Sequence, residues 1–137
     1  MQQRIKRLSV PNYIWTVFAL SVGAMIVFLS TVPLQLPPVA NIGLSVDKLA
    51  HSFAYFVLAT NCGLALEFDW EIKKSNNLLM GTLFLFGLCL ELIQGYVLDY
   101  RTFEAYDLVA NTIGILAFIL LAKTIKKIVV KSRIFLN

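Results

Sequence analysis

Charged residues are scarce in this sequence. Only 15% of its 137 residues are Asp, Glu, Lys or Arg, whereas 58% are hydrophobic. A soluble globular domain is about one quarter charged and about half apolar, so the composition indicates lipid as the solvent. The net charge of +4 does not come from a basic patch interleaved with aromatic residues, so no nucleic-acid partner is predicted.

Cysteine and histidine are also rare. The two cysteines, Cys62 and Cys89, form no CxxC pair, and the single histidine, His51, is not part of an HExxH motif. The chain also lacks a Ser-His-Asp order or a Cys-His pair suited to nucleophilic catalysis. The sequence therefore predicts no cofactor and no resident metal.

Four apolar runs are long enough to cross a membrane as helices, which requires about 20 residues each. The predicted spans are 13–32, 47–66, 78–98 and 106–122. The first run is longer than the core of a cleavable signal peptide, about 7–15 residues, and prolines beginning with Pro33 end it. A polar loop over 67–77 and a turn over 99–105 separate the later runs. The sequence thus predicts one all-α domain, a polytopic bundle of four transmembrane helices.

Small residues recur at helix-packing spacing in two of these runs. Ala19 and Gly23 are four residues apart in the first, and Ala59 and Gly63 are four apart in the second. Small residues at this spacing let helix backbones approach closely within a membrane. The pattern favours a compact bundle.

Basic residues are distributed unequally between the two sides of this bundle. Ten of the twelve Lys and Arg residues lie before the first span, between the second and third, or after the fourth. Only Lys48 and Arg101 lie on the other side. The positive-inside rule therefore places both termini in the cytoplasm. The basic segment over 123–133 is interpreted as a topology anchor on anionic lipid.

Polar residues within the predicted spans fall into three stripes, whose members are three or four residues apart and so share a helix face. The stripes are Asp47, His51 and Tyr55 in the second span, Glu91 and Gln94 in the third, and Asp107 and Asn111 in the fourth. Because successive spans run in opposite directions, all three stripes lie at the extracytoplasmic face. We expect them to form, with Lys48 and Arg101, one polar ligand-binding pocket.

Glu91 is the most costly of these residues to bury. It lies roughly 10 Å from the predicted end of its span, at about 1.5 Å per residue. A carboxylate at that depth needs a partner, a proton or a polar cavity, and the available partners are Arg101, His51 and Gln94. Arg101 could instead neutralise Asp107, or bind a phosphate or carboxylate through two parallel hydrogen bonds.

Each of the other site residues also has a structural interpretation. His51 either ties the second span to the third or acts as a general acid or base, because its reference pKa is about 6.5. Asp107 can stabilise a helix dipole, Asn111 can bridge helices, and Lys48 can snorkel to the interface. A metal held by His51 and the carboxylates is disfavoured by the two cations nearby.

Taken in order, these residues resemble the VanZ-like family. The match reads Asp47-Lys-x-x-His51 with Tyr55 a turn later, then Glu91-x-x-Gln94, Arg101 and Asp107-x-x-x-Asn111 followed by Gly114, over about residues 47–121. The resemblance implies a small multi-pass protein of the bacterial cytoplasmic membrane. The family is named for a protein associated with resistance to the glycopeptide teicoplanin. It supplies no agreed catalytic residue, and a resistance role does not follow from the residues themselves.

Two functions are predicted as alternatives, beside a structural accessory role. In the first, the pocket binds a cell-envelope ligand, and Arg101 holds its anionic group. The ligand is a lipid headgroup, a lipid-linked precursor or an amphiphilic glycopeptide such as teicoplanin. In the second, the chain is a membrane-embedded enzyme in which Glu91 and His51 perform acid–base chemistry on a lipid. Membrane lipids are the expected partners in either case.

Overall fold

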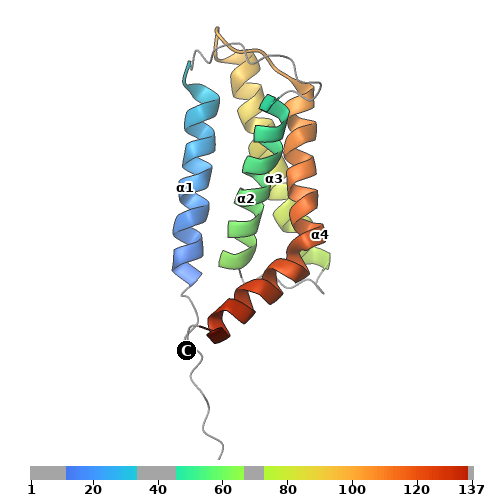
Figure 1. Ribbon diagram of the computed structural model, residues 1–137. Coiled ribbons are helices and arrows are strands. Elements are labelled where there is room, and N and C mark those ends of the chain that lie inside the picture. Colours follow the sequence, from blue (N-terminus) through green and yellow to red (C-terminus); the bar gives the residue numbers. More distant parts are fainter. Residues whose placement is uncertain (1–11, 34–45, 67–72, 136–137) are drawn as a thin grey trace, which may run out of the picture.

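The structure is a computed structural model that describes residues 12–33, 46–66 and 73–135. Within these ranges the chain forms four α-helices and no strand: α1 (Asn12–Thr31), α2 (Val46–Ala65), α3 (Lys73–Tyr96) and α4 (Ala105–Phe135). Figure 1 shows them side by side, with successive helices running in opposite directions. The all-α prediction is confirmed. α1, α3 and α4 each contain a stretch long and apolar enough to cross a membrane.

α2 is the helix that falls short of that criterion. Its first turns carry Asp47, Lys48 and His51, and Asn61 lies near its end, so its apolar stretch is diluted. α2 nevertheless lies between α1 and α4, and it packs most extensively against α4 and next against α1. A central helix of this kind can carry polar side chains because they meet other helices rather than lipid tails.

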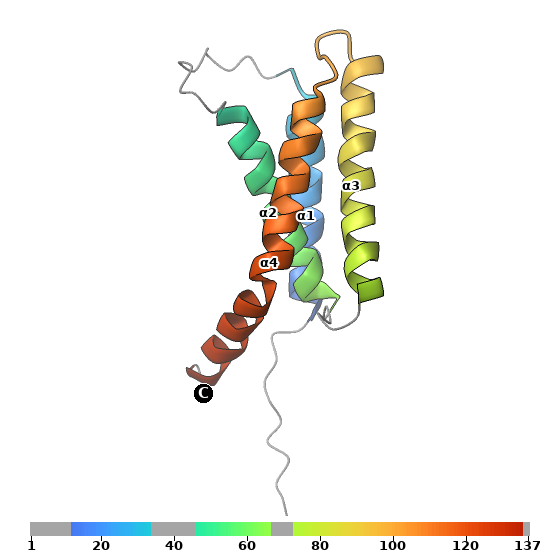
Figure 2. The ribbon, with the colours of Figure 1, turned by 90° about the vertical axis from the view of Figure 1, so that its right-hand side faces the viewer.

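Two helix boundaries differ from the predicted ones. α3 begins at Lys73 rather than at residue 78, which shortens the predicted polar loop; residues 67–72 lie outside the described ranges. α4 continues to Phe135 rather than ending at 122, so the basic segment is helical and not a tail. Its C-terminal part bends out of line with the first part of the helix in both Figure 1 and Figure 2, and in Figure 1 it passes below α2. Hydropathy marks where an apolar stretch ends, whereas Lys and Leu are comparably good helix formers, so the helix extends further.

The other boundaries lie close to the predicted ones. α1 and α2 each begin and end within one residue of the expected positions, and Pro33 follows α1 without helical structure. The basic residues before α1 and the two prolines that follow Pro33, at 37 and 38, lie outside the described residues.

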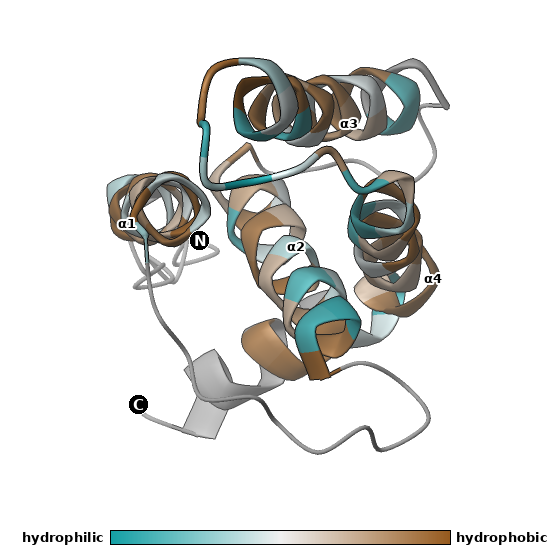
Figure 3. Ribbon diagram, turned by 90° about the horizontal axis from the view of Figure 1, so that it is seen from above, coloured by the Kyte–Doolittle hydropathy of each residue, from teal (hydrophilic) through white to brown (hydrophobic). Residues whose placement is uncertain are grey.

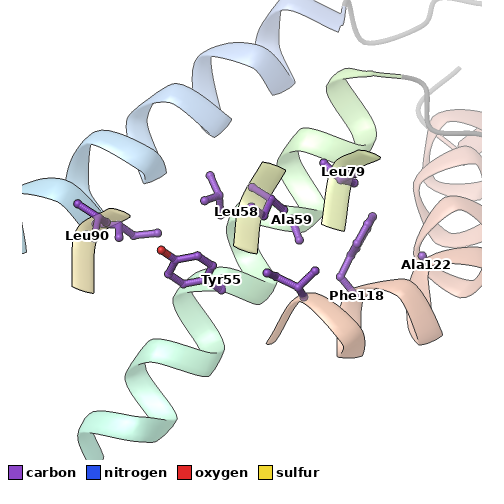
Figure 4. Close-up of a cluster of buried hydrophobic side chains, with 10 residues drawn as sticks. Tyr55, Leu58, Ala59, Leu79, Leu90, Phe118 and Ala122 are labelled. Carbon is purple, nitrogen blue, oxygen red and sulfur yellow. The ribbon is translucent and has the colours of Figure 1, made fainter. Parts of the chain in front are cut away.

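An apolar core joins the helices, and Figure 4 shows part of it. Its buried members are Ile26 of α1; Tyr55, Leu58 and Ala59 of α2; Leu79, Leu83 and Leu90 of α3; and Ile115, Phe118 and Ala122 of α4. α2 and α4 are in close contact at two glycines. A Cβ atom at Gly63 would lie 2.4 Å from the Phe118 ring, and one at Gly114 would lie 2.1 Å from the Ser52 carbonyl oxygen. Neither position has room for a side chain.

The end of the bundle at which α1 and α3 finish and α2 and α4 begin is called here the polar end. It is the upper end in Figure 1, and residues 97–104 connect α3 to α4 across it. Figure 3 looks onto this end and shows hydrophilic residues on the first turns of α2 and along that connection. The alternation of helix direction therefore brings the polar ends of α2, α3 and α4 to one level.

Candidate functional site

The structure places all nine residues of the predicted site at or near the polar end. They are Asp47, Lys48, His51 and Tyr55 on α2, Glu91 and Gln94 on α3, Arg101 in the connection, and Asp107 and Asn111 on α4. Because each stripe occupies one face of its helix, its members point the same way. Five of them, Tyr55, Glu91, Gln94, Asp107 and Asn111, are buried.

Lys48 is at the centre of an ion-pair network. Its Nζ lies 3.0 Å from the carboxylate of Asp47 and 2.6 Å from that of Glu104, and it also pairs with Asp107. The Asp107 side chain is buried, whereas those of Asp47 and Glu104 are half-exposed. Lys48 therefore joins α2 to the start of α4 instead of reaching alone towards the membrane interface.

His51 also links α2 to α4. Its Nδ1 lies 3.2 Å from Oδ1 of Asn111, and because that oxygen only accepts, we assign the proton to Nδ1. The other nitrogen, Nε2, lies 3.6 Å from a carboxylate oxygen of Asp107 and 3.8 Å from one of Asp47. His51 thus bridges α2 to α4, and not to α3 as the sequence had suggested, and it presents its other ring nitrogen to two carboxylates.

Asp47, His51 and Asp107 could together offer three ligand atoms to a cation. These atoms lie within 4.8 Å of one another. However, the ammonium group of Lys48 pairs with both carboxylates. A metal ion at this place would have to displace that side chain, so the cluster is best described as an ion-pair network.

Glu91 is 1% exposed and is one of the most deeply buried side chains. Its carboxylate accepts a hydrogen bond of 3.3 Å from the backbone N–H of Glu104. Among the described residues, neither Arg101 nor His51 nor Gln94 forms a hydrogen bond or ion pair with it, so none of the three side chains available from the sequence is its bonded partner. A carboxylate this buried with one hydrogen bond is costly to the folded state.

Gln94 and Arg101 instead bond to α1, together with Tyr100. Gln94 Nε2 donates to the carbonyl of Ser30 at 2.9 Å, Arg101 Nη2 donates to that of Leu29 at 3.2 Å, and the Tyr100 hydroxyl donates to that of Thr31. The last four carbonyl groups of a helix have no partner within the helix. Side chains from α3 and the following connection therefore cap the end of α1.

Tyr55 lies between α2 and α3, one helical turn further from the polar end than His51. Its side chain is 1% exposed, and its hydroxyl has no hydrogen-bond partner within the described ranges. A Cβ atom at Gly87 would lie 3.0 Å from that hydroxyl and 3.2 Å from Nδ2 of Asn111. The absence of a side chain at Gly87 is therefore what lets Tyr55 and Asn111 come together here.

Two adjoining cavities open at the polar end. The polar cavity has a volume of about 250 Å³ and is lined by Asp47, Gln94, Tyr100, Arg101, Thr102, Glu104 and Asp107. The side cavity, of about 210 Å³, lies between Ile26, Leu29 and Ser30 of α1 and Ala50, His51, Ala54 and Tyr55 of α2. Asp47, Gln94 and Arg101 line both. The two cavities therefore meet at these three side chains.

Arg101 differs from Lys48 in its partners. Lys48 pairs with three carboxylates, whereas Arg101 has no carboxylate partner in the part of the chain that the structure describes. Its guanidinium group lies at the wall of both cavities, where a ligand could reach it. The site can therefore offer a cation to an anion in the cavity.

Among the contributors to the site that were missed from the sequence are Ser30, Tyr100 and Glu104. Glu104 precedes α4, and it is three residues from both Arg101 and Asp107, so its spacing could have pointed to it. Tyr100 lay in a stretch interpreted only as a turn. Ser30 gave no signal, because it contributes a backbone carbonyl, which any residue would provide.

Comparison with known proteins extends the resemblance seen in the polar residues. The sequence model of the VanZ/LLP1 family matches residues 2–127, which includes α1 and most of α4. Searches of curated proteins and of solved structures gave no significant match. VanZ family proteins are membrane proteins, in agreement with the three long apolar helices of this chain. The chain belongs to the VanZ/LLP1 family and is a VanZ-like membrane protein.

Proposed function

We propose that all four helices cross a bacterial cytoplasmic membrane, with both termini in the cytoplasm and the polar end outside. α2 has 20 residues, as α1 has, and about 20 are enough to span the hydrocarbon core. Ten of the twelve Lys and Arg residues precede α1 in the sequence, lie at the start of α3 or lie in the last part of α4, which favours the end opposite the polar end as cytoplasmic.

Cysteine labelling tests this topology. The natural cysteines, Cys62 and Cys89, are first replaced by alanine, and a cysteine is introduced by Asn77→Cys or Tyr100→Cys. A membrane-impermeant maleimide applied to intact spheroplasts should label the second variant and not the first. Labelling of Asn77→Cys from outside would move the polar end to the cytoplasm and overturn the placement.

On this topology, the chain binds an anionic ligand of the cell envelope at its polar end. The observation that carries the proposal is the Arg101 guanidinium group, which lies at the wall of both cavities without a carboxylate partner among the described residues. The planar fork of an arginine matches phosphate and carboxylate groups through two parallel hydrogen bonds. Lipid headgroups, lipid-linked precursors and amphiphilic glycopeptides such as teicoplanin are the ligand classes to test.

Binding is tested with the purified full-length protein in a mild detergent. Its thermal midpoint is followed while phosphatidylglycerol, phosphatidylcholine or teicoplanin is added, because a ligand that binds only the folded state raises the midpoint. We expect an anionic ligand to raise it and phosphatidylcholine not to. Arg101→Ala should abolish the shift, and Arg101→Lys should retain part of it, since Lys keeps the charge without the fork.

Lys123→Ala is the matched control, because it removes an exposed cation at the opposite end of the bundle from Arg101. Its ligand-induced shift should equal that of the parent. If Arg101→Ala and Lys123→Ala both shift like the parent, or if no anionic ligand shifts the parent, the binding proposal falls.

Acid–base chemistry on the bound ligand is a second candidate. It is favoured by the geometry of His51, whose Nε2 faces Asp47 and Asp107 and whose ring lines the side cavity. Glu91 remains the other candidate, although no bond joins it to His51 in the described structure. Overexpression of the parent should then change the membrane lipid profile, and Glu91→Gln or His51→Ala should cancel the change. Identical profiles for parent and variants would remove this candidate.

A further inference from the structure

The side cavity differs in character from the polar cavity beside it. Every residue that lines the polar cavity is polar. The side cavity has Ile26 and Leu29 on its α1 wall and Ala50 and Ala54 on its α2 wall. The two meet at Arg101, which lines both. Together they form one space that is polar at one end and largely apolar at the other.

We propose that the side cavity holds the first part of the hydrocarbon chain of an anionic lipid whose headgroup lies at Arg101. This inference rests on the proposed function, because it takes the anion at Arg101 as given. A ligand that fills both cavities has to be amphiphilic. The side cavity, at about 210 Å³, is smaller than pockets that enclose a drug-sized molecule, about 300–1,000 Å³. The rest of the chain therefore stays in the bilayer.

The packing of α1 provides the route for such a chain. α1 contacts α2 and, less extensively, α3, but it makes no contact with α4 within the described ranges. Figure 3 shows α2 between α1 and α4. Large side chains of α1, among them Phe18, Leu20 and Phe28, are exposed, as expected for a helix surrounded by lipid. The space between α1 and α2 is therefore bordered by the bilayer, and a lipid can enter from the side.

The hydrogen bond between Arg101 and α1 links headgroup binding to the space between α1 and α2 through which the lipid enters. Arg101 donates to the carbonyl of Leu29 at 3.2 Å, and both residues line the side cavity. A phosphate competes for the same guanidinium group and forms a charge-assisted bond, which is stronger than a bond to a neutral carbonyl. Headgroup binding would therefore release one of the three bonds that hold the end of α1, next to the entrance.

The test compares two probes that share one headgroup. Phosphatidic acid carries glycerol phosphate with two hydrocarbon chains, and glycerol 3-phosphate lacks the chains. Binding of each to the purified full-length protein is measured by thermal shift in a mild detergent. Ala54→Leu places extra atoms in the side cavity, and Ala24→Leu makes the same change on an exposed face of α1 outside it.

We expect Ala54→Leu to weaken phosphatidic acid binding about tenfold by steric overlap with the chain. Binding of glycerol 3-phosphate should not change, and Ala24→Leu should bind both probes like the parent. Ala50→Leu, at a more exposed position of the same wall, repeats the experiment if Ala54→Leu does not fold.

The outcomes distinguish the hydrocarbon-chain site in the side cavity from the anion binding at Arg101 on which it rests. If Arg101→Ala abolishes binding of both probes while the alanine-to-leucine variants in the cavity bind phosphatidic acid like the parent, the headgroup site stands and the chain site falls. If the parent binds glycerol 3-phosphate as tightly as phosphatidic acid, the chain site falls as well. If the parent binds neither probe, the chain site falls together with the lipid headgroup as ligand, and the proposed function itself fails if teicoplanin and phosphatidylglycerol give no shift either.

Discussion

The α2–α4 seam and the polar end are built in contrasting ways. At the seam, defined by Ser52, Gly63, Gly114 and Phe118, the two helices touch so closely that neither glycine has room for a Cβ atom. At the polar end, side chains reach across gaps to one another, and two cavities remain between them. Shape fixes the helices at the seam, whereas charge and hydrogen bonding fill the polar end.

This contrast indicates where stability and function reside. In lipid, apolar helices associate mainly through close packing, because the surrounding chains are as apolar as the helices. The seam should therefore carry most of the stability. The polar end contains a buried carboxylate with one hydrogen bond and a guanidinium group without a carboxylate partner in the described structure, and close packing of apolar helices requires neither feature.

The largest loss of stability is expected for Gly114→Ala. The added Cβ would lie 2.1 Å from the backbone oxygen of Ser52, and a backbone atom in a helix cannot rotate aside. We expect the free energy of unfolding to fall by at least the ~1–3 kcal/mol typical of overpacking. Gly81→Ala is the control, because a Cβ atom added there would have nothing within 4 Å of it. Equal thermal midpoints for the two variants would show that the helices are not in contact at the seam.

Lys48→Met should have the next largest effect. It leaves the buried carboxylate of Asp107 without its cation, and breaking a buried ion pair costs about 3–5 kcal/mol. Because the Lys48 side chain is 23% exposed, we expect a loss at or below the lower end of that range.

Two comparison variants identify the cause of that loss. Adding Asp107→Asn to Lys48→Met should recover most of the thermal midpoint. Asp47→Asn, at the half-exposed partner, should cost about 0–1 kcal/mol, as for surface pairs. If the double variant is no more stable than Lys48→Met, the ammonium group matters through packing and not through its charge.

The fold could be predicted from the sequence because its signals are local. Four apolar runs separated by polar or proline-containing segments fix the number of helices, and alternation of direction fixes which stripes share an end. The same reasoning places Asp47, Glu91 and Asp107 at one level from residue spacing alone. The predicted end of α4, at residue 122, was too early because hydropathy marks only the end of the apolar stretch. The helix itself continues through the basic residues to Phe135.

The partners within the site could not be predicted from the sequence. Spacing says which residues share a face, but a choice of partner depends on how the helices rotate and on the path of the connection. From the sequence, Arg101 could pair with Glu91 or Asp107 or bind an external anion, whereas the connection directs it to the carbonyl of Leu29. The backbone N–H of Glu104 donates to the Glu91 carboxylate instead. Because every residue except proline has a backbone N–H, the identity of residue 104 could not indicate this bond.

A smaller, local effect is expected when the capping of α1 is reduced. Gln94→Leu and Tyr100→Phe each remove one hydrogen bond to an α1 carbonyl, which is worth about 0.5–1.5 kcal/mol. Hydrogen exchange at the C-terminal end of α1 should become faster in both. Thr82→Val is the control, because the Thr82 hydroxyl bonds within its own helix. Unchanged exchange in both capping variants would mean that packing against α2 alone holds α1.

The smallest change in stability, and one of opposite sign, is expected for Glu91→Gln. A neutral amide costs less to bury than a carboxylate, and its oxygen can still accept the bond from the N–H of Glu104. The thermal midpoint should therefore stay the same or rise, in contrast to the destabilising variants above. If stability is kept while ligand binding or turnover is lost, the carboxylate is retained for function at the expense of stability. A fall of several degrees in both Glu91→Gln and His51→Ala would instead show that the polar network holds the bundle together, and the structural role would then be the better account of this end.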